Sequence, residues 1–325
     1  MKKYIAILLA AAMATLGISA CRKENSNKET KVQKDSDIKV VTTIFPEYDW
    51  VRQIAGEEAD QMDITMLLDN GVDLHSYQPT AEDIMKVSDC DLFVYVGGES
   101  DAWVDDALKQ AKNKDMQVVD LLDVLGNSAK EEEVIEGMEP EEEDEEPEYD
   151  EHVWLSVKNA EVLSKAIADA LEKVDPDHKD IYQENASAYS EKLKDLDAKY
   201  QEVVDGASQK TLLFGDRFPF RYLVDDYGLS YYAAFVGCSA ESEASFDTIS
   251  FLANKVDELG LKDIMAIENS NQKIAKTIIE NTKEKNQKIL TLDTMQSTTS
   301  DDVKNGTTYL SVMEKNLEVL KEALQ

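Results

Sequence analysis

Two of the three histidines in this sequence lie in short segments that are rich in other polar residues. His75 lies in GVDLHSYQPTAED, residues 71–83, and His152 lies in YDEHVWLSV, residues 149–157. Histidine is the commonest metal ligand in proteins and also carries protons near neutral pH. The third, His178, lies in the polar turn DPDHKDIY, where we expect an exposed residue without a functional role. The first two are therefore candidate metal ligands.

Two aspartates come directly after, or at the end of, predicted strands in the second half of the chain. Asp216 follows KTLLFG, and Asp293 ends KILTLD. Histidine and carboxylate together suit Zn²⁺, and carboxylates also suit Mn²⁺. Aspartate is equally common in turns at strand ends, where it binds nothing. Glu268, in AIEN, is a reserve candidate at another strand end.

The predicted elements place these side chains at one edge of two sheets. Predicted strands alternate with predicted helices, which indicates βαβ units and parallel sheets. Ligands of such sheets bind outside the carboxyl ends of the strands. The eight predicted strands cover residues 38–44, 62–68, 92–98, 116–122, 210–215, 229–237, 262–269 and 288–293.

A long helix is predicted between the two sets of strands, over residues 180–206, with no glycine or proline before Gly206. Such a helix spans about 40 Å, which is enough to brace two domains. The sequence thus predicts an α/β protein of two Rossmann-like domains with parallel sheets, residues 38–179 and 207–325, joined by this single helix. We expect the metal site in the cleft between the domains.

The N-terminus predicts export and membrane anchoring. Lys2 and Lys3 precede an apolar run that ends in small residues, as in a secretory signal peptide over residues 1–20. LGISAC resembles a bacterial lipobox, which implies cleavage before Cys21 and a lipid on its sulfur that holds the chain to a membrane. Residues 21–37 are polar and are expected to form a flexible tether.

The formal net charge of −33 argues against a nucleic-acid partner, because nucleic-acid phosphates require a basic surface. Residues 131–151 form an acidic loop with fourteen Asp and Glu and no basic residue. Two interpretations stay open: a solvated loop of repelling charges, or a weak collector of cations through carboxylate oxygens. We expect Cys90 and Cys238, in different predicted domains, to be buried free thiols rather than a disulfide.

Four segments resemble the solute-binding lipoproteins of bacterial zinc and manganese ABC transporters. They are VVTTIFPEYDWVRQIAG, GVDLHSYQPTAED, DEHVWLSV and LTLDTMQ, and the resemblance extends from about Ile38 to the C-terminus. It implies a monomeric, non-enzymatic receptor outside the cytoplasm that captures Zn²⁺, with Mn²⁺ as the second candidate. It also implies delivery to a membrane permease and a ligand set that includes His75 and His152.

The chain departs from that family in its third ligand. The family usually offers His or Glu in a segment where this chain has FGDRFPFRYLVDDYG. Asp216 is the nearest carboxylate and is the expected third ligand, although Arg217 beside it is also a candidate to pair with it. The acidic loop stands where many zinc-binding members carry a His-rich loop, which favours the cation-collecting interpretation.

Two other classes of function remain open. A metal-dependent hydrolase needs a general base near metal-bound water, as in H-E-x-x-H, and the sequence contains neither this motif nor G-x-S-x-G. A surface adhesin or cation buffer would bind metal through the acidic loop alone. The pair of histidine motifs favours the receptor.

Overall fold

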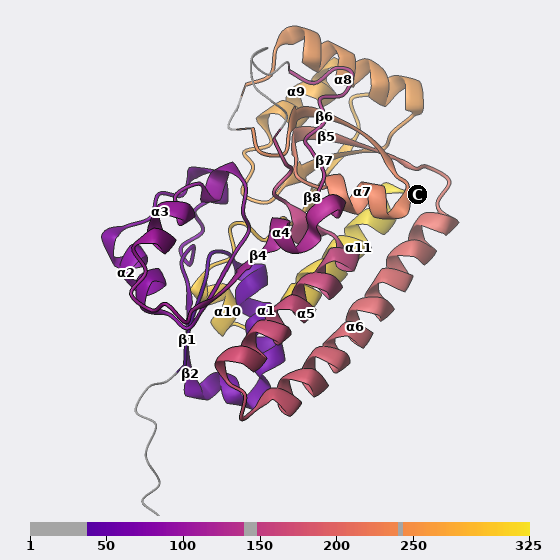
Figure 1. The fold of residues 1–325 in the computed structure, drawn as a ribbon. Coiled ribbons are helices and arrows are strands. Elements are labelled where there is room, and N and C mark those ends of the chain that lie inside the picture. Colours follow the sequence, from indigo (N-terminus) through magenta and orange to yellow (C-terminus); the bar gives the residue numbers. More distant parts are fainter. Residues whose placement is uncertain (1–37, 140–147, 240–242) are drawn as a thin grey trace, which may run out of the picture. The chain divides into compact units, whose positions relative to one another are not determined.

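Two four-stranded parallel sheets form the frame of the protein (Figure 1). The computed structural model describes residues 38–139, 148–239 and 243–325. The first sheet has the order β2-β1-β3-β4, and the second has the order β6-β5-β7-β8. The predicted α/β fold with two parallel sheets is confirmed. The strands are β1 (Ile38–Thr42), β2 (Met62–Met66), β3 (Leu92–Tyr95), β4 (Gln117–Asp120), β5 (Thr211–Phe218), β6 (Ser230–Val236), β7 (Asp263–Ile267) and β8 (Lys288–Leu292).

Helices connect the strands of each sheet, and several of them begin at a capping side chain. The Thr80 hydroxyl accepts a hydrogen bond from the Asp83 N–H at 3.2 Å, and the Asp83 carboxylate in turn accepts the Thr80 N–H, which starts α2. The helices besides the long one are α1 (Phe45–Ala55), α2 (Ala81–Asp89), α3 (Val104–Lys109), α4 (Leu121–Leu125), α5 (Val157–Val174), α7 (Arg221–Tyr227), α8 (Phe246–Leu259), α9 (Lys273–Asn281), α10 (Ser300–Lys304) and α11 (Tyr309–Ala323). Single turns of 3-10 helix include η2 (Leu74–Ser76), η3 (Glu99–Asp101) and η5 (Val153–Leu155).

The long helix is α6 (Lys179–Gly206), with 28 residues. Its buried side chains recur at helical spacing on one face: Tyr182, Tyr189, Leu193, Leu196, Tyr200 and Val204. This face contacts α1 and α5 from the first half of the chain and α11 from the second. The Tyr200 hydroxyl, for example, donates to the Met313 carbonyl at 2.7 Å. One helix therefore packs against elements of both halves (Figure 1).

The predicted strand ends differ from the observed ones by one to three residues, and the difference at β5 matters for the site. β4 stops at Asp120, whose carboxylate caps α4, whereas we predicted a strand through residue 122. β5 continues to Phe218 across a shift in its pairing with β6 between Phe214 and Arg217. Asp216 thus lies within β5 and not after it, because the irregular pairing lets the strand extend beyond the predicted end at residue 215.

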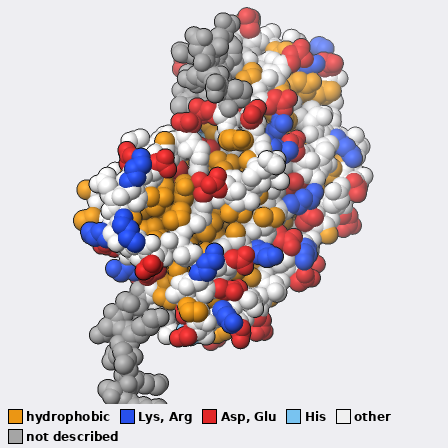
Figure 2. Space-filling model, viewed as in Figure 1, with side chains coloured by type: hydrophobic (Ala, Val, Ile, Leu, Met, Phe, Trp, Pro, Cys, Tyr) orange, Lys and Arg blue, Asp and Glu red, His pale blue; other side chains and the backbone are white. Residues whose placement is uncertain are grey.

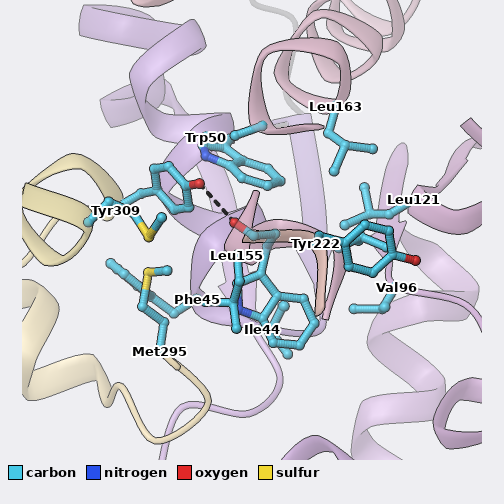
Figure 3. Close-up of a cluster of buried hydrophobic side chains, with 14 of the residues drawn as sticks. Ile44, Phe45, Trp50, Val96, Leu121, Leu155, Leu163, Tyr222, Met295 and Tyr309 are labelled. Carbon is cyan, nitrogen blue, oxygen red and sulfur yellow. Dashed lines mark hydrogen bonds between the residues drawn. The ribbon is translucent and has the colours of Figure 1, made fainter. Parts of the chain in front are cut away.

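A buried cluster joins the chain around His152 to the second half of the molecule. The Trp154 indole donates to the Thr294 carbonyl, and the Tyr309 hydroxyl donates to the Trp154 carbonyl, both at 2.8 Å. Figure 3 shows Tyr309, Leu155 and Met295 packed together with other apolar side chains in this cluster. Close packing of this kind resists displacement. The backbone that carries His152 is therefore held firmly in place.

Acidic and basic side chains are interspersed over the face shown in Figure 2, with hydrophobic side chains gathered near its middle. Across the described ranges, no helix is both long and apolar enough to cross a bilayer. The predicted signal peptide, Cys21 and the tether lie outside the described residues, as does the middle of the acidic loop, residues 140–147.

Candidate metal site

His75 and His152 approach one another through their ring edges, with their Nε2 atoms 3.1 Å apart and their ring planes tilted by 55°. His75 lies on η2, in the loop that follows the carboxyl end of β2, and Asp73 accepts its backbone N–H at 3.1 Å. His152 directly precedes η5 and is completely buried. The structure therefore brings together the two histidines that the sequence singled out.

The other ring nitrogen of each histidine is held by a neighbour. His75 Nδ1 lies 2.9 Å from Ser100 Oγ and 3.3 Å from a Glu151 carboxylate oxygen. His152 Nδ1 lies 2.9 Å from Asp150 Oδ1, which also accepts the His152 backbone N–H at 2.9 Å. A metal-binding histidine typically donates its other N–H to a carboxylate or carbonyl in this way. With these partners beside both Nδ1 atoms, the two Nε2 atoms are the ring nitrogens left to bind a cation together.

A third donor lies beside the two histidines. In the part of the chain that the structure describes, one group of three potential metal ligands is found: His75 and His152 nitrogens and the Cys238 sulfur, all within 4.8 Å of one another. Cys238 lies in the turn after β6, and its N–H donates to Glu132 at 2.8 Å. Gly237 lets this turn approach, because a Cβ there would lie 3.1 Å from the His152 ring and 2.9 Å from the Phe218 carbonyl.

Burial and charge hold His152 neutral. Burial, the neighbouring His75 and the Arg217 guanidinium lower the pKa of His152 well below its usual value. Burial raises the pKa of Asp150 to about 7. For Glu151, burial favours the protonated form, but interactions with His75 and Ser100 outweigh it and hold the pKa below its usual value. A neutral imidazole with carboxylates behind it is the form in which histidine binds metals.

One basic side chain reaches the edge of the site. The Arg217 guanidinium, from β5, pairs with the carboxylate of Asp73 rather than with its sequence neighbour Asp216. Although burial opposes ionisation of Asp73, the charge of Arg217 holds the pKa of this carboxyl below its usual range. The pair neutralises a positive charge that would otherwise repel a cation from the histidines.

The two predicted aspartates accept hydrogen bonds from backbone N–H groups. Asp216 accepts the N–H groups of Arg217 and Ile267 at 3.0 and 3.5 Å. Asp293 follows β8, as predicted, and accepts the Met295 N–H at 2.8 Å. The structure does not bring these two into the group of potential ligands.

Glu268 is also outside that group. It accepts hydrogen bonds from the Thr294 N–H and hydroxyl, at 2.7 and 2.5 Å.

Sequence reasoning missed Cys238. It was interpreted as a buried free thiol, and both it and Cys90 are indeed unpaired, although Cys238 is only partly buried. Its position directly after a predicted strand of the second half is the same signal that pointed to Asp216 and Asp293. His178, expected to be exposed, is half-buried, and its Nδ1 lies 2.7 Å from Asp175.

Comparison with known proteins finds relatives that are named for zinc binding or zinc uptake. Residues 40–323 match the family model of the periplasmic zinc-uptake complex component A, ZnuA. The chain is 35% identical over 324 residues to the zinc-binding lipoprotein AdcA of Streptococcus pneumoniae (strain ATCC BAA-255 / R6), covering 98% of this chain but 61% of AdcA. It is 31% identical over 330 residues to the high-affinity zinc uptake system protein ZnuA of Bacillus subtilis (strain 168), covering 99% and 98% of the two chains.

A solved structure is similar as well. The Zn(II)-bound ZnuA-like domain of Streptococcus pneumoniae AdcA superposes with a TM-score of 0.69 at 31% identity, covering 89% of this chain and 99% of that domain. The chain thus spans about three fifths of the length of the AdcA relative and matches the length of this domain and of the Bacillus protein.

Proposed function

This chain belongs to the family of zinc-uptake complex component A proteins, and we propose that it captures Zn²⁺ outside the cytoplasm and delivers it to the permease of an ABC transporter. Zn²⁺ is the cargo of the site rather than a resident cofactor. Mn²⁺ is the weaker candidate, because zinc binds more tightly than manganese at almost any site of nitrogen, oxygen and sulfur donors.

The observation that carries the proposal is the facing pair of Nε2 atoms, 3.1 Å apart. Zn²⁺ binds histidine nitrogen at about 2.0–2.1 Å in tetrahedral geometry, so two histidine ligands of one ion lie roughly 3.3 Å apart. The rings therefore need almost no movement to receive the ion. A site that is already arranged for its ligand loses little free energy to reorganisation when it binds.

The surroundings of the pair favour a divalent cation. Asp150 and Glu151 are each 2% exposed and contact the Nδ1 sides of the two rings. Buried negative charge next to the rings offsets the charge that the ion brings into a place of low dielectric. We assign Asp216, Asp293 and Glu268 to holding the backbone at the ends of β7 and β8 and not to the metal itself, since their oxygens are engaged with backbone and hydroxyl groups.

Export and anchoring complete the proposal. We propose that residues 1–20 are removed, that a lipid on Cys21 holds the chain to the outer side of a bacterial membrane, and that residues 21–37 act as a tether. The mature chain would work as a monomer, with domains 38–179 and 207–325 joined by α6. A role in binding and transport, rather than in catalysis, is the one that the name of the matching family describes.

Zinc accumulation by intact cells tests delivery. In the bacterium that encodes this chain, deletion of its gene should lower zinc uptake in zinc-poor medium, and the wild-type gene should restore it. A gene with His75→Ala and His152→Ala together should not. Restoration by the double variant to the wild-type level would overturn the proposal, provided that both proteins reach the cell surface in equal amounts.

A further inference from the structure

We propose that Cys238 supplies a thiolate as the third ligand of the metal site, so that the cargo is a thiophilic divalent ion, Zn²⁺ or Cd²⁺, and not Mn²⁺. This inference rests on the proposed function, since it concerns the same site. It replaces the ligand set of two histidines and two aspartates expected from the sequence by a softer set.

The distances fit a single ion. The sulfur and the two histidine nitrogens lie within 4.8 Å of one another. Ligand atoms around a tetrahedral Zn²⁺, bound at about 2.0–2.1 Å through nitrogen and about 2.3 Å through sulfur, lie roughly 3.3–3.6 Å apart. The histidine nitrogens, 3.1 Å apart, are slightly closer than this, and the cysteine sulfur, within 4.8 Å of them, has to move closer to complete the site.

The backbone is built to bring this sulfur close. β6 ends in the Gly237–Cys238 turn, which the Cys238 N–H fastens to Glu132 at 2.8 Å. Any side chain at position 237 would press on the His152 ring at 3.1 Å and on the Phe218 carbonyl at 2.9 Å. Glycine at this position therefore permits a contact between the turn and His152 that other residues would prevent.

A second observation points to a cation at the same place. Glu151 is 2% exposed, and its Oε2 has no hydrogen-bond partner, although it lies 3.3 Å from His75 Nδ1. A buried carboxylate oxygen without a donor costs free energy unless positive charge comes close. An ion bound to Nε2 of His75 makes the Nδ1 side of that ring more positive, which provides such charge.

Cys90 is a thiol in the hydrophobic core and serves as a comparison for Cys238. It is completely buried, and its Sγ donates to the Val87 carbonyl at 3.2 Å, away from the histidines. Cys238 is only partly buried and lies beside two imidazoles. The two thiols form a matched pair for experiment, one in the core and one at the site.

Coordination by sulfur sets the preference between metals. When Zn²⁺ binds, the Cys238 S–H bond breaks, a Zn–S bond forms and one proton leaves to the solvent. Thiolate favours Zn²⁺ and other soft ions, whereas Mn²⁺ prefers carboxylate and water oxygens. A site with this sulfur should therefore exclude Mn²⁺ more strongly than two histidines and two carboxylates would.

Cobalt spectroscopy of the mature chain tests the inference. All proteins carry Cys21→Ser, which leaves Cys90 and Cys238 as the two thiols. With Co²⁺ bound, the parent and Cys90→Ala should show an intense near-ultraviolet sulfur-to-cobalt charge-transfer band. Cys238→Ser should lose this band, and its zinc affinity should fall by about 10-fold or more while its manganese affinity changes little. Cys238→Ala, compared by circular dichroism, serves if the serine variant does not fold.

The outcomes separate this inference from the proposed function. If Co²⁺ and Zn²⁺ bind to the parent without a charge-transfer band, or if the band survives in Cys238→Ser, the thiolate ligand is wrong while the histidine receptor stands. If the parent binds neither ion, the proposed function fails and this inference fails with it.

Discussion

The Arg217 guanidinium on β5 forms an ion pair with the Asp73 carboxylate, two residues before the metal-site histidine His75. The pair thus joins the second sheet to the loop that carries His75. Asp73 also accepts the His75 backbone N–H at 3.1 Å, so this one residue contacts both Arg217 and His75. Its carboxylate also neutralises the Arg217 guanidinium, a positive charge on β5 that lowers the pKa of His152.

Asp73→Asn should weaken zinc binding by about 10-fold, as is usual for a residue that supports a metal ligand. The amide keeps the shape of the carboxylate but leaves the Arg217 charge uncompensated next to the site. Arg217→Gln in the same chain should recover part of the loss. Competition against a chromophoric chelator measures both effects.

Asp106→Asn is the matched control, because Asp106 pairs with Lys109 at 2.9 Å on the exposed side of α3 and should leave zinc affinity unchanged. Equal losses from Asp73→Asn and from this control would mean that the ion pair has no special role.

Asp216→Ala should leave zinc affinity within about twofold of wild type, since the structure engages its carboxylate with the Arg217 and Ile267 N–H groups. Loss of these hydrogen bonds should cost about 1 kcal/mol of unfolding free energy. Calorimetric zinc titration and urea denaturation measure the two quantities. A large loss of zinc affinity with little loss of stability would instead make Asp216 a ligand, as the sequence alone suggested.

Deletion of residues 140–147 should keep one tight zinc site and remove weak ones. This stretch contains six acidic residues. The two sides of the acidic loop are paired at its base, where Glu131 bridges Tyr149 and the Glu132 N–H donates to the Glu148 carbonyl at 2.8 Å. Asp150 must stay, because it holds His152.

Equilibrium dialysis against zinc gives the number of ions bound by each chain. Loss of the tight site on deletion would favour the interpretation that the acidic loop does all the binding. An unchanged number of weak sites would favour a merely solvated loop.

The metal-free protein should be less stable at pH 8 than at pH 6. Burial and the nearby Glu151 charge raise the pKa of Asp101 to about 7, although hydrogen bonds from the Gly97 and Val96 N–H groups oppose the shift. A carboxyl whose pKa is higher in the folded than in the unfolded protein stabilises the fold at low pH. This contribution to the free energy of unfolding is lost as the pH rises from the unfolded pKa to the folded pKa. Between pH 6 and 8 the loss should be on the order of 1 kcal/mol.

Thermal denaturation at the two pH values tests this, with Asp101→Asn as the comparison. The amide cannot ionise, so the variant should show a smaller difference between pH 6 and pH 8. If the difference is as large in the variant as in the wild type, other groups cause it.

The sequence was sufficient to predict the two parallel sheets and to identify His75 and His152 as candidate metal ligands. Regular alternation of apolar strands and helices placed all eight strands, and local motifs around His75 and His152 identified the pair. Strand ends were less certain, because the irregular pairing of β5 with β6 depends on long-range contacts that no local pattern encodes. For this reason Asp216 was placed after its strand and assigned to the metal.

Cys238 illustrates a different gap. A single cysteine after a strand belongs to no sequence motif. Whether it can bind a metal depends on which residues of the first half of the chain lie next to it in the fold. Only the fold shows that Gly237 packs against His152, 85 residues earlier in the chain. Glu151 is likewise the last residue of the acidic loop in sequence, and its buried contact with His75 depends on the fold.

Zinc titration of single histidine variants tests the central claim most directly. His75→Ala and His152→Ala should each weaken zinc binding by more than about 100-fold, beyond the usual effect of supporting residues, while far-UV circular dichroism stays unchanged. His178→Ala should keep wild-type zinc affinity, although it loses the contact with Asp175 at 2.7 Å. Zinc affinity that falls as far in His178→Ala as in His75→Ala, or that survives in both metal-site variants, would contradict the account.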